Sequence, residues 1–166
     1  MSIGRFYAGI GVLIWDPMSN NYLILKRSDE KDFAPGYWEC VTGRVDQGEG
    51  FVEAAHREVR EELNVSVDLI EILGTTHFYR GEKRPDFELI GVVFLGVIGT
   101  PESIKISEEH SEFQWVTTAE VKAILRSEAD SEGWLARVID RAETIIANLP
   151  TAVFEINRRN EFELDS

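Results

Sequence analysis

Cysteine and long apolar runs are both scarce in this chain of 166 residues. A single cysteine, Cys40, excludes a disulfide framework and a zinc site made of several thiolates. No apolar run reaches the ~18–20 residues of a membrane span, and the N-terminal segment has no basic stretch followed by a cleavage site. We therefore expect a cytoplasmic protein with no membrane partner.

Positive charge is also in short supply. The chain has 17 Lys and Arg residues against 30 Asp and Glu residues, which gives a net charge of −13. Binding to a long nucleic acid requires a basic surface, so the composition argues against that function. A small phosphorylated substrate remains compatible with it, because bound metal ions invert the field of an acidic pocket.

No internal repeat, low-complexity segment or linker interrupts the sequence, and its length suits one domain, placed at residues 1–150. Apolar patterns predict strands at residues 7–16, 22–26, 38–41, 88–98 and 113–116, and two strands joined by a turn within 65–79. Helices are expected at residues 50–63 and 134–149, and from Thr117, where Glu120 completes a capping box. Elements in this order predict a mixed β-sheet held between helices, an α/β/α sandwich.

The last segment, residues 151–166, follows Pro150 and alternates apolar with polar residues around a turn at 157–160. This alternation predicts a C-terminal β-hairpin. An isolated hairpin is only marginally stable, so we expect it to dock on its own domain or on a second subunit, which would give a homodimer. A frayed tail is the alternative.

The most informative stretch, residues 43–65, reads G-R-V-D-Q-G-E-G-F-V-E-A-A-H-R-E-V-R-E-E-L-N-V. Glu58, Glu61 and Glu62 fall at spacings that place them on one side of a helix. Three like charges there cost roughly 0.2–0.5 kcal/mol per pair unless a cation binds between them. Carboxylate oxygens suit Mg²⁺, Mn²⁺ or Ca²⁺ rather than zinc. The alternative is an amphipathic surface helix whose acids lie in solvent.

This stretch resembles the Nudix box, G-x5-E-x7-R-E-U-x-E-E-x-G-U, in which U is a bulky aliphatic residue. Eight of its nine fixed positions are filled, by Gly43, Glu49, Arg57, Glu58, Val59, Glu61, Glu62 and Val65. Asn64 replaces the usual glycine after the helix, and asparagine is the best substitute for glycine in a left-handed backbone. The resemblance implies the Nudix fold and hydrolysis of a phosphoanhydride bond with Mg²⁺, or Mn²⁺ in its place, releasing pyrophosphate or phosphate.

The same resemblance implies a set of metal ligands: Glu58, Glu61, Glu62 and the backbone carbonyl of Gly43. Glu58 would be the catalytic base or a ligand that orients the attacking water. Arg57 and Glu49 would brace these acids through ion pairs without touching the substrate.

A further acid from outside the box often completes the metal site in Nudix proteins. Glu109 is the preferred candidate and Glu112 the second, because their stretch resembles the place where several family members carry it. A surface acid in an acidic loop is the alternative for each of them. His110, between them, is either a structural residue or a partner that supports the site.

Arginine and aromatic side chains near the box are candidates for holding the substrate. Arg27 and Arg44 are expected to bind terminal phosphates. The candidates for stacking on a base are Trp38, Phe33 and Tyr79. Trp38 can equally pack beside the box loop, and the basic residues at 80–84 are expected to form a solvated loop.

The substrate class follows from a more local resemblance. Residues 38–43, W-E-C-V-T-G, are similar to the Nudix subgroup that acts on nucleoside and pterin triphosphates. Dinucleoside polyphosphates and nucleotide sugars are the alternative substrates for the same chemistry. Two other functions stay open. One is a non-catalytic nucleotide-sensing module, which usually lacks box acids. The other is a diphosphate isomerase, which needs an active-site cysteine, whereas the setting of Cys40 indicates strand packing.

Overall fold

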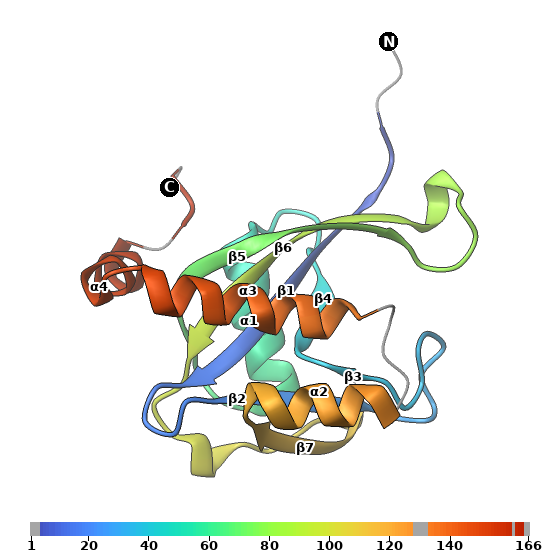
Figure 1. The fold of residues 1–166 in the computed structure, drawn as a ribbon. Coiled ribbons are helices and arrows are strands. Elements are labelled where there is room, and N and C mark those ends of the chain that lie inside the picture. The colour runs from blue at the N-terminus through green and yellow to red at the C-terminus, as the bar shows by residue number, and fades with distance from the viewer. Residues whose placement is uncertain (1–3, 128–132, 161, 165–166) are drawn as a thin grey trace.

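The computed structural model describes residues 4–127, 133–160 and 162–164 (Figure 1). Within these residues the strands of one mixed sheet are β1 (Tyr7–Asp16), β2 (Asn21–Arg27), β3 (Trp38–Glu39), β4 (Val41–Arg44), β5 (Asp68–Tyr79), β6 (Glu88–Val97) and β7 (His110–Val116). The helices are α1 (Phe51–Leu63), α2 (Thr118–Ser127), α3 (Trp134–Asn148), α4 (Thr151–Asn160) and the short 3-10 helices η1 (Pro85–Phe87) and η2 (Pro101–Ser103).

Strand β1 runs through the middle of the sheet, whose order is β3-β2-β1-β6-β5. It pairs antiparallel with β2 and β4 and parallel with β6. Strand β7 pairs with β2, and His110 at its start lies opposite Arg27, where the register shifts. Such an irregularity changes the direction in which the side chains of a strand point. This strand arrangement brings His110 at the start of β7 within 3.1 Å of Glu39 of β3, the strand that precedes the box.

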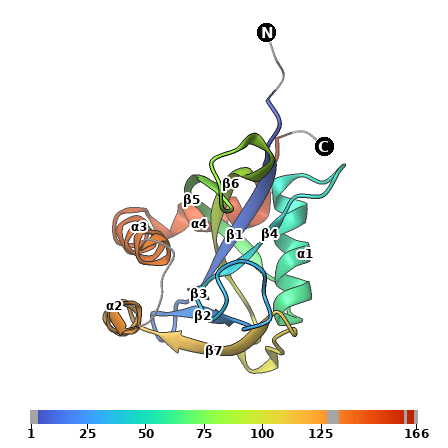
Figure 2. The ribbon, with the colours of Figure 1, turned by 90° about the vertical axis from the view of Figure 1, so that its right-hand side faces the viewer.

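Helices cover both faces of the sheet, which confirms the expected α/β/α sandwich (Figure 2). Helix α1 buries Val52, Ala55, Val59 and Leu63 against one face. Helix α3 buries Leu135, Val138, Ile139 and Ala142 against the other. Neighbouring residues of β1 divide between the two cores, Leu13 to that of α3 and Val12 to that of α1, as the two-residue period of a strand requires. None of the helices in the described part of the chain has the length and apolar character needed to cross a bilayer.

Helix α1 ends at Asn64, whose backbone is left-handed with φ 57° and ψ 31° and whose N–H donates to the carbonyl of Arg60. Asparagine tolerates that conformation, so the departure from the glycine of the box leaves the helix end intact. The expected capping box of α2 is also present. The Glu120 carboxylate accepts from the Thr117 N–H at 2.8 Å, and the Glu120 N–H donates to the Thr117 hydroxyl at 3.3 Å.

Residues 65–79 contain one strand, so the prediction of two strands and a turn is wrong. Strand β5 is continuous and pairs with β6, with register shifts between Leu69 and Glu71 and between Ile72 and Gly74. A bulge inserts a residue without ending the pairing of two strands. Gly74, a residue typical of turns, lies at such an irregularity instead.

The C-terminal segment is helical over residues 151–160, so the predicted hairpin is wrong there. Helix α4 buries Phe154, and the side-chain amide of Asn157 donates to the carbonyl of Ile70 at 2.9 Å. Residues three apart share one side of a helix, whereas the alternation of apolar residues suggested a strand. The tail therefore docks on β5 of its own chain. Residues 161, 165 and 166 of the expected hairpin lie outside the described residues.

Candidate active site

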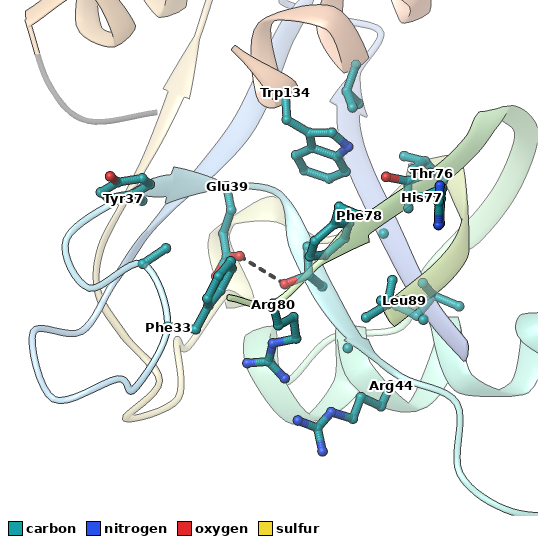
Figure 3. Close-up of a pocket in the computed structure, with 18 of the residues that line it drawn as sticks. Phe33, Tyr37, Glu39, Arg44, Thr76, His77, Phe78, Arg80, Leu89 and Trp134 are labelled. Carbon is teal, nitrogen blue, oxygen red and sulfur yellow. Dashed lines mark hydrogen bonds between the residues drawn. The ribbon is translucent and has the colours of Figure 1, made fainter. Parts of the chain in front are cut away.

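A cavity of about 1160 Å³ lies beside β1, and its lining comes from both halves of the sheet and from helices α1 and α3. Figure 3 shows Glu39, Arg44, Phe78, Arg80 and Trp134 around it. The box supplies one wall, through β4 and α1. The loop before β3, strand β5 and helix α3 supply much of the rest, together with residues of β1 and β6 and Glu109. The site is thus assembled from segments far apart in the sequence.

Glu58 and Gly43 meet at the box wall of the cavity. Gly43 lies in β4 opposite Ile10 of β1, and Glu58 lies in the second half of α1. The Glu58 carboxyl packs so closely on Gly43 that a Cβ at this position would collide with it. Any larger residue at position 43 would force the Glu58 carboxyl to move away from β4. Burial raises the pKa of Glu58, and the Arg57 guanidinium opposes that rise.

Arg57 forms hydrogen bonds with three acids of the box, Glu49, Glu58 and Glu61. Its guanidinium donates to both carboxylate oxygens of Glu49, at 2.7 and 2.9 Å, to Glu58 at 2.8 Å and to Glu61 at 3.1 Å. It also donates to the carbonyl of Arg44 at 2.8 Å. The hydrogen bond from Arg57 is the main reason that the pKa of Glu49 falls to about 2. These bonds fix the three acids relative to one another and tie α1 to the loop before it.

Glu62 lies on the buried side of the last turn of α1, where its side chain is 4% exposed. Its Oε2 atom has no hydrogen-bond partner among the described residues. Burial, and then the charges of Glu39, Glu58 and Glu109, raise its pKa well above the ordinary value. A buried carboxylate among other carboxylates is unfavourable unless a cation compensates for it.

Glu109 lines the cavity and is among the acids that raise the pKa of Glu62. It pairs with Lys31, and this contact lowers the pKa of Glu109. Glu112, the second candidate, accepts a hydrogen bond from Gln114 at 2.6 Å and is not part of the cavity lining. The structure therefore brings Glu109, and not Glu112, toward the box acids.

The box acids do not all converge on one point. The Glu61 side chain is 60% exposed and turns to Arg57, and within the described ranges no three His, Cys, Asp or Glu side chains are arranged as a finished metal site. The residues nevertheless fit a hard divalent cation, because the unpaired oxygen of Glu62, the Glu58 carboxylate and the Gly43 carbonyl are all oxygen donors.

Arg44 and Arg80 place positive charge at the cavity (Figure 3). Arg44 stands over the ring of Tyr7 at 4.7 Å, and Arg80 over the ring of Phe33 at 5.2 Å. Burial lowers the pKa of Arg80, and the positive charge of Arg44 adds to that effect. Arg44 is thus near enough to Arg80 for its charge to affect the pKa of Arg80. Two neighbouring guanidinium groups suit a ligand with several negative charges.

Arg27 also lines the cavity, but its hydrogen bonds stay within the protein. Its Nη1 atom donates to both oxygens of Glu39, at 2.8 and 2.9 Å, and its Nε atom donates to the carbonyl of Phe33 at 2.9 Å. The expected phosphate-binding role therefore suits Arg44 and Arg80 better than Arg27.

Aromatic side chains line much of the cavity beyond the arginines: Phe33, Tyr37, Phe78, Tyr79 and Trp134. The rings of Phe33 and Phe78 are inclined by only 22°, with centroids 6.4 Å apart. Near-parallel aromatic rings are suited to the flat face of a base. In Figure 3, Tyr37 lies at the left of the cavity and Trp134 at its top.

Trp38 and Cys40 are core residues. Trp38 is 3% exposed and packs in the core beside α3, so its ring is not available to stack on a base although it borders the cavity. Cys40 is 1% exposed, and burial raises the pKa of its thiol. A buried thiol with a raised pKa is a poor nucleophile, which argues against the isomerase alternative.

Four of the residues that line the cavity were not among the site residues expected from the sequence: Glu39, Phe78, Arg80 and Trp134. A signal for Glu39 was present, because it lies between buried Trp38 and Cys40 and strand alternation turns it to the other face. Arg80 was expected in a solvated loop and Trp134 in the core. Both reach the cavity through the packing of distant segments, with α3 in contact with β5, and no local pattern encodes such contacts.

The chain is similar to known proteins in family, in sequence and in fold. Residues 5–138 match the family model described as the NUDIX domain. The chain is 31% identical over 102 residues to the nucleoside triphosphatase NudI of Escherichia coli O139:H28. The aligned region covers 57% of this chain and 72% of the relative. Its fold is similar to that of the MutT protein from Methanosarcina mazei Go1, with a TM-score of 0.68, 23% identity and coverage of 87% of this chain and 98% of that one. The Escherichia coli dihydroneopterin triphosphate pyrophosphohydrolase gives a TM-score of 0.62 and 20% identity, over 87% and 99% of the two chains.

Proposed function

The chain belongs to the Nudix hydrolase family, and we propose that it hydrolyses a phosphoanhydride bond in a nucleoside triphosphate or a related small nucleotide, with Mg²⁺ as its metal ion. Nudix enzymes act on small nucleotides with divalent cations. Mn²⁺ is the alternative ion, because the same oxygen donors suit both.

The main support for this proposal is the charge of the residues that line the cavity. Its basic residues are Arg27, Lys31, Arg44, Arg80, Arg137 and Arg141, and its acids are Glu39, Glu58 and Glu109, a balance of six to three. The whole chain has the opposite balance, 17 to 30. A cavity that reverses the charge of its protein concentrates anions, and a polyphosphate chain is such an anion.

Different residues of the chain have different roles in the proposed hydrolysis. A divalent ion, when bound, neutralises phosphate charge and makes a bound water more acidic. Glu58, whose pKa is raised by burial, is placed to take a proton from the attacking water. Arg44 and Arg80 hold the phosphates, and Arg57 keeps the box acids in position. Attack on a phosphoanhydride is in line, so this positioning accounts for most of the catalysis.

We place the nucleobase of the substrate in the aromatic part of the cavity. Phe33 and Phe78 offer nearly parallel ring faces beside Arg80. Stacking of a base on an aromatic ring contributes about 1–3 kcal/mol and is tolerant of base identity. The similarity to NudI, a nucleoside triphosphatase, supports a triphosphate over other small nucleotides.

A substrate panel tests the proposal. Nucleoside triphosphates, a pterin triphosphate, dinucleoside polyphosphates and nucleotide sugars are incubated with Mg²⁺ or Mn²⁺ in ¹⁸O-labelled water, and product masses are recorded. We expect a nucleoside triphosphate to be cleaved fastest, with one labelled oxygen in one product. Faster cleavage of a dinucleoside polyphosphate would replace nucleoside triphosphates as the proposed substrate class. No cleavage of any compound with either ion would refute the proposal.

Two expectations from the sequence stay proposals. A cytoplasmic location fits the lone, buried thiol of Cys40. A homodimer through the tail loses its original basis, because α4 docks on β5 of its own chain. Sedimentation of the full chain and of a chain without residues 151–166 measures whether the tail joins two subunits.

A further inference from the structure

His110 lies beside Glu62 although it is no part of the box. It opens β7 and stands opposite Arg27 of β2, at the register shift of that pair. Its side chain is 1% exposed, and its Nε2 atom lies 3.1 Å from Oε1 of Glu39 and 3.8 Å from Oε2 of Glu62. One edge of a buried imidazole thus faces the buried carboxylate of Glu62 and the partly buried carboxylate of Glu39.

The contact with Glu39 fixes how His110 is oriented. A carboxylate oxygen only accepts hydrogen bonds, so the 3.1 Å contact requires that Nε2 of His110 carries the hydrogen. The Nδ1 atom has no partner among the described residues. The hydrogen bond to Glu39 therefore determines both the tautomer and the rotation of the ring.

Glu39 is itself held firmly. Its two oxygens accept from Nη1 of Arg27 at 2.8 and 2.9 Å, and Oε2 also accepts from the hydroxyl of Thr42 at 2.9 Å. Arg27, Thr42 and His110 thus all donate hydrogen bonds to this carboxylate. A charge-assisted set of this kind leaves Glu39 little freedom to rotate.

The backbone keeps His110 at a fixed distance from Glu62. The N–H of Ser107 donates to the carbonyl of Glu62 at 2.9 Å, and the N–H of Lys105 donates to the carbonyl of Leu63 at 3.0 Å. The segment that leads to His110 is thus fastened to the end of α1. The Glu62 carboxyl also has a hydrogen bond with the backbone of Thr42.

We propose that Glu39 and His110 are positioning residues that orient the carboxylate of Glu62 for a divalent cation. Glu39 holds the imidazole, and the N–H edge of the imidazole faces Oε2 of Glu62 and limits the rotation of that carboxylate. The remaining lone pairs of Glu62 are then left for the ion. This inference rests on the proposed function, in which Glu62 is a metal ligand, and neither positioning residue needs to touch the substrate.

Calorimetric titration with Mn²⁺ alone tests the inference on the full chain and two variants, His110→Leu and His110→Gln. Glutamine places an amide N–H near the position of Nε2, whereas leucine fills space without a donor. Loss of a residue that orients a metal ligand typically weakens metal binding 10–100-fold. We expect a loss in that range for His110→Leu, and restoration to within about threefold of wild type for His110→Gln.

Glu39→Gln provides a second variant in case leucine at 110 prevents folding. An amide oxygen cannot accept from all the donors around Glu39, and its NH₂ group would face one of them, so we expect about a tenfold loss of Mn²⁺ affinity. Glu112→Gln is the matched control, because Glu112 is also a carboxylate of the β7 region but lies outside the cavity lining. Its Mn²⁺ affinity should equal that of wild type.

The outcomes separate this inference from the proposed function. Wild-type affinity in a folded His110→Leu or Glu39→Gln chain, judged by melting in EDTA, would overturn the positioning role alone. Equal losses in His110→Leu and His110→Gln would also overturn it, because the Nε2 donor would then not be the cause. Absence of Mn²⁺ uptake by the wild-type chain itself would refute the proposed function, and this inference with it.

Discussion

The two flanks of helix α1 hold their acids in opposite ways. On one flank, Glu49, Glu58 and Glu61 share the guanidinium of Arg57, and the Glu61 side chain is 60% exposed. On the other flank, Glu62 is buried, and its Oε2 atom has no hydrogen-bond partner among the described residues. The sequence places Glu61 and Glu62 side by side, but the sheet buries only the second.

The difference shows which acid binds a cation at the lower cost. A guanidinium and a metal ion compete for the same carboxylate lone pairs, so Glu61 must give up part of its pairing with Arg57 to become a ligand. Glu62 has no such partner on Oε2 and already bears the unfavourable free energy of burial. A cation relieves that unfavourable energy. We therefore expect Glu62 to be the stronger ligand.

The largest effect should come from removing the buried acid. We predict that Glu62→Gln lowers kcat/KM about 100-fold or more, equivalent to about 2.7 kcal/mol, and that Glu61→Gln lowers it about tenfold. Steady-state kinetics at saturating Mg²⁺ measures both values, with melting in EDTA as the control for folding. A loss in Glu61→Gln that equals or exceeds the loss in Glu62→Gln would remove the distinction between the flanks.

Arg57→Lys probes the flank on which the acids share Arg57. Lysine cannot donate two parallel hydrogen bonds to Glu49 while reaching Glu58, so the acids lose their common anchor. We predict about a tenfold loss of kcat and about 1 kcal/mol lower free energy of unfolding in urea. The matched control is Arg158→Lys, whose guanidinium pairs with surface Asp68. Its stability should change by less than about 0.5 kcal/mol. Equal effects of the two changes would contradict a special role for Arg57.

The pH dependence of stability should also show which acids of α1 are buried. Burial raises the pKa of Glu58 and Glu62 above their ordinary 4.5, so both bind protons more tightly in the folded state than in the unfolded state. Their contribution to stability is therefore complete below pH 4.5 and is lost as the pH rises through the raised values. In EDTA, urea unfolding from pH 5 to pH 8 should show this loss in wild type and a smaller one in Glu62→Gln. Mn²⁺ should reduce it, because the ion replaces the proton. Identical slopes in the two chains would contradict the burial account.

The smallest effect should come from the start of α1. The Glu163 carboxylate accepts from the N–H of Val52 at 3.0 Å, and Phe162 packs on Phe94 with ring centroids 5.6 Å apart. A carboxylate at a helix N-terminus contributes about 0.3–1 kcal/mol. We predict that Glu163→Gln lowers the free energy of unfolding within that range, whereas Leu164→Ala, at a side chain 99% exposed, leaves it unchanged. No difference between the two variants in urea would show that this contact does not stabilise the helix.

Local patterns predicted the elements of the fold better than their contacts. Helix α1 falls within one residue of its expected bounds, because its apolar period and its left-handed end at Asn64 are both written in adjacent residues. The expected hairpin failed because the alternation of apolar residues in the tail also fits a helix whose Phe154 and Asn157 face the sheet.

The candidate site was predictable where one segment supplies it. The spacing of the box was enough to name Glu58, Glu61 and Glu62, but not to say that burial separates Glu61 from its neighbour. Arg80 and Trp134 reach the cavity from segments 54 residues apart, through packing that no local period records. The same holds for the contact of Glu39 with His110, which joins strands distant in the sequence.

The most direct test of the account is the calorimetric titration of Mn²⁺ into the wild-type chain and into Glu62→Gln. We predict that the wild-type chain binds Mn²⁺ and that Glu62→Gln binds it at least tenfold more weakly while melting in EDTA at the same temperature or higher. Equal affinity in the two chains would contradict the claim that the buried carboxylate of α1 holds the catalytic ion.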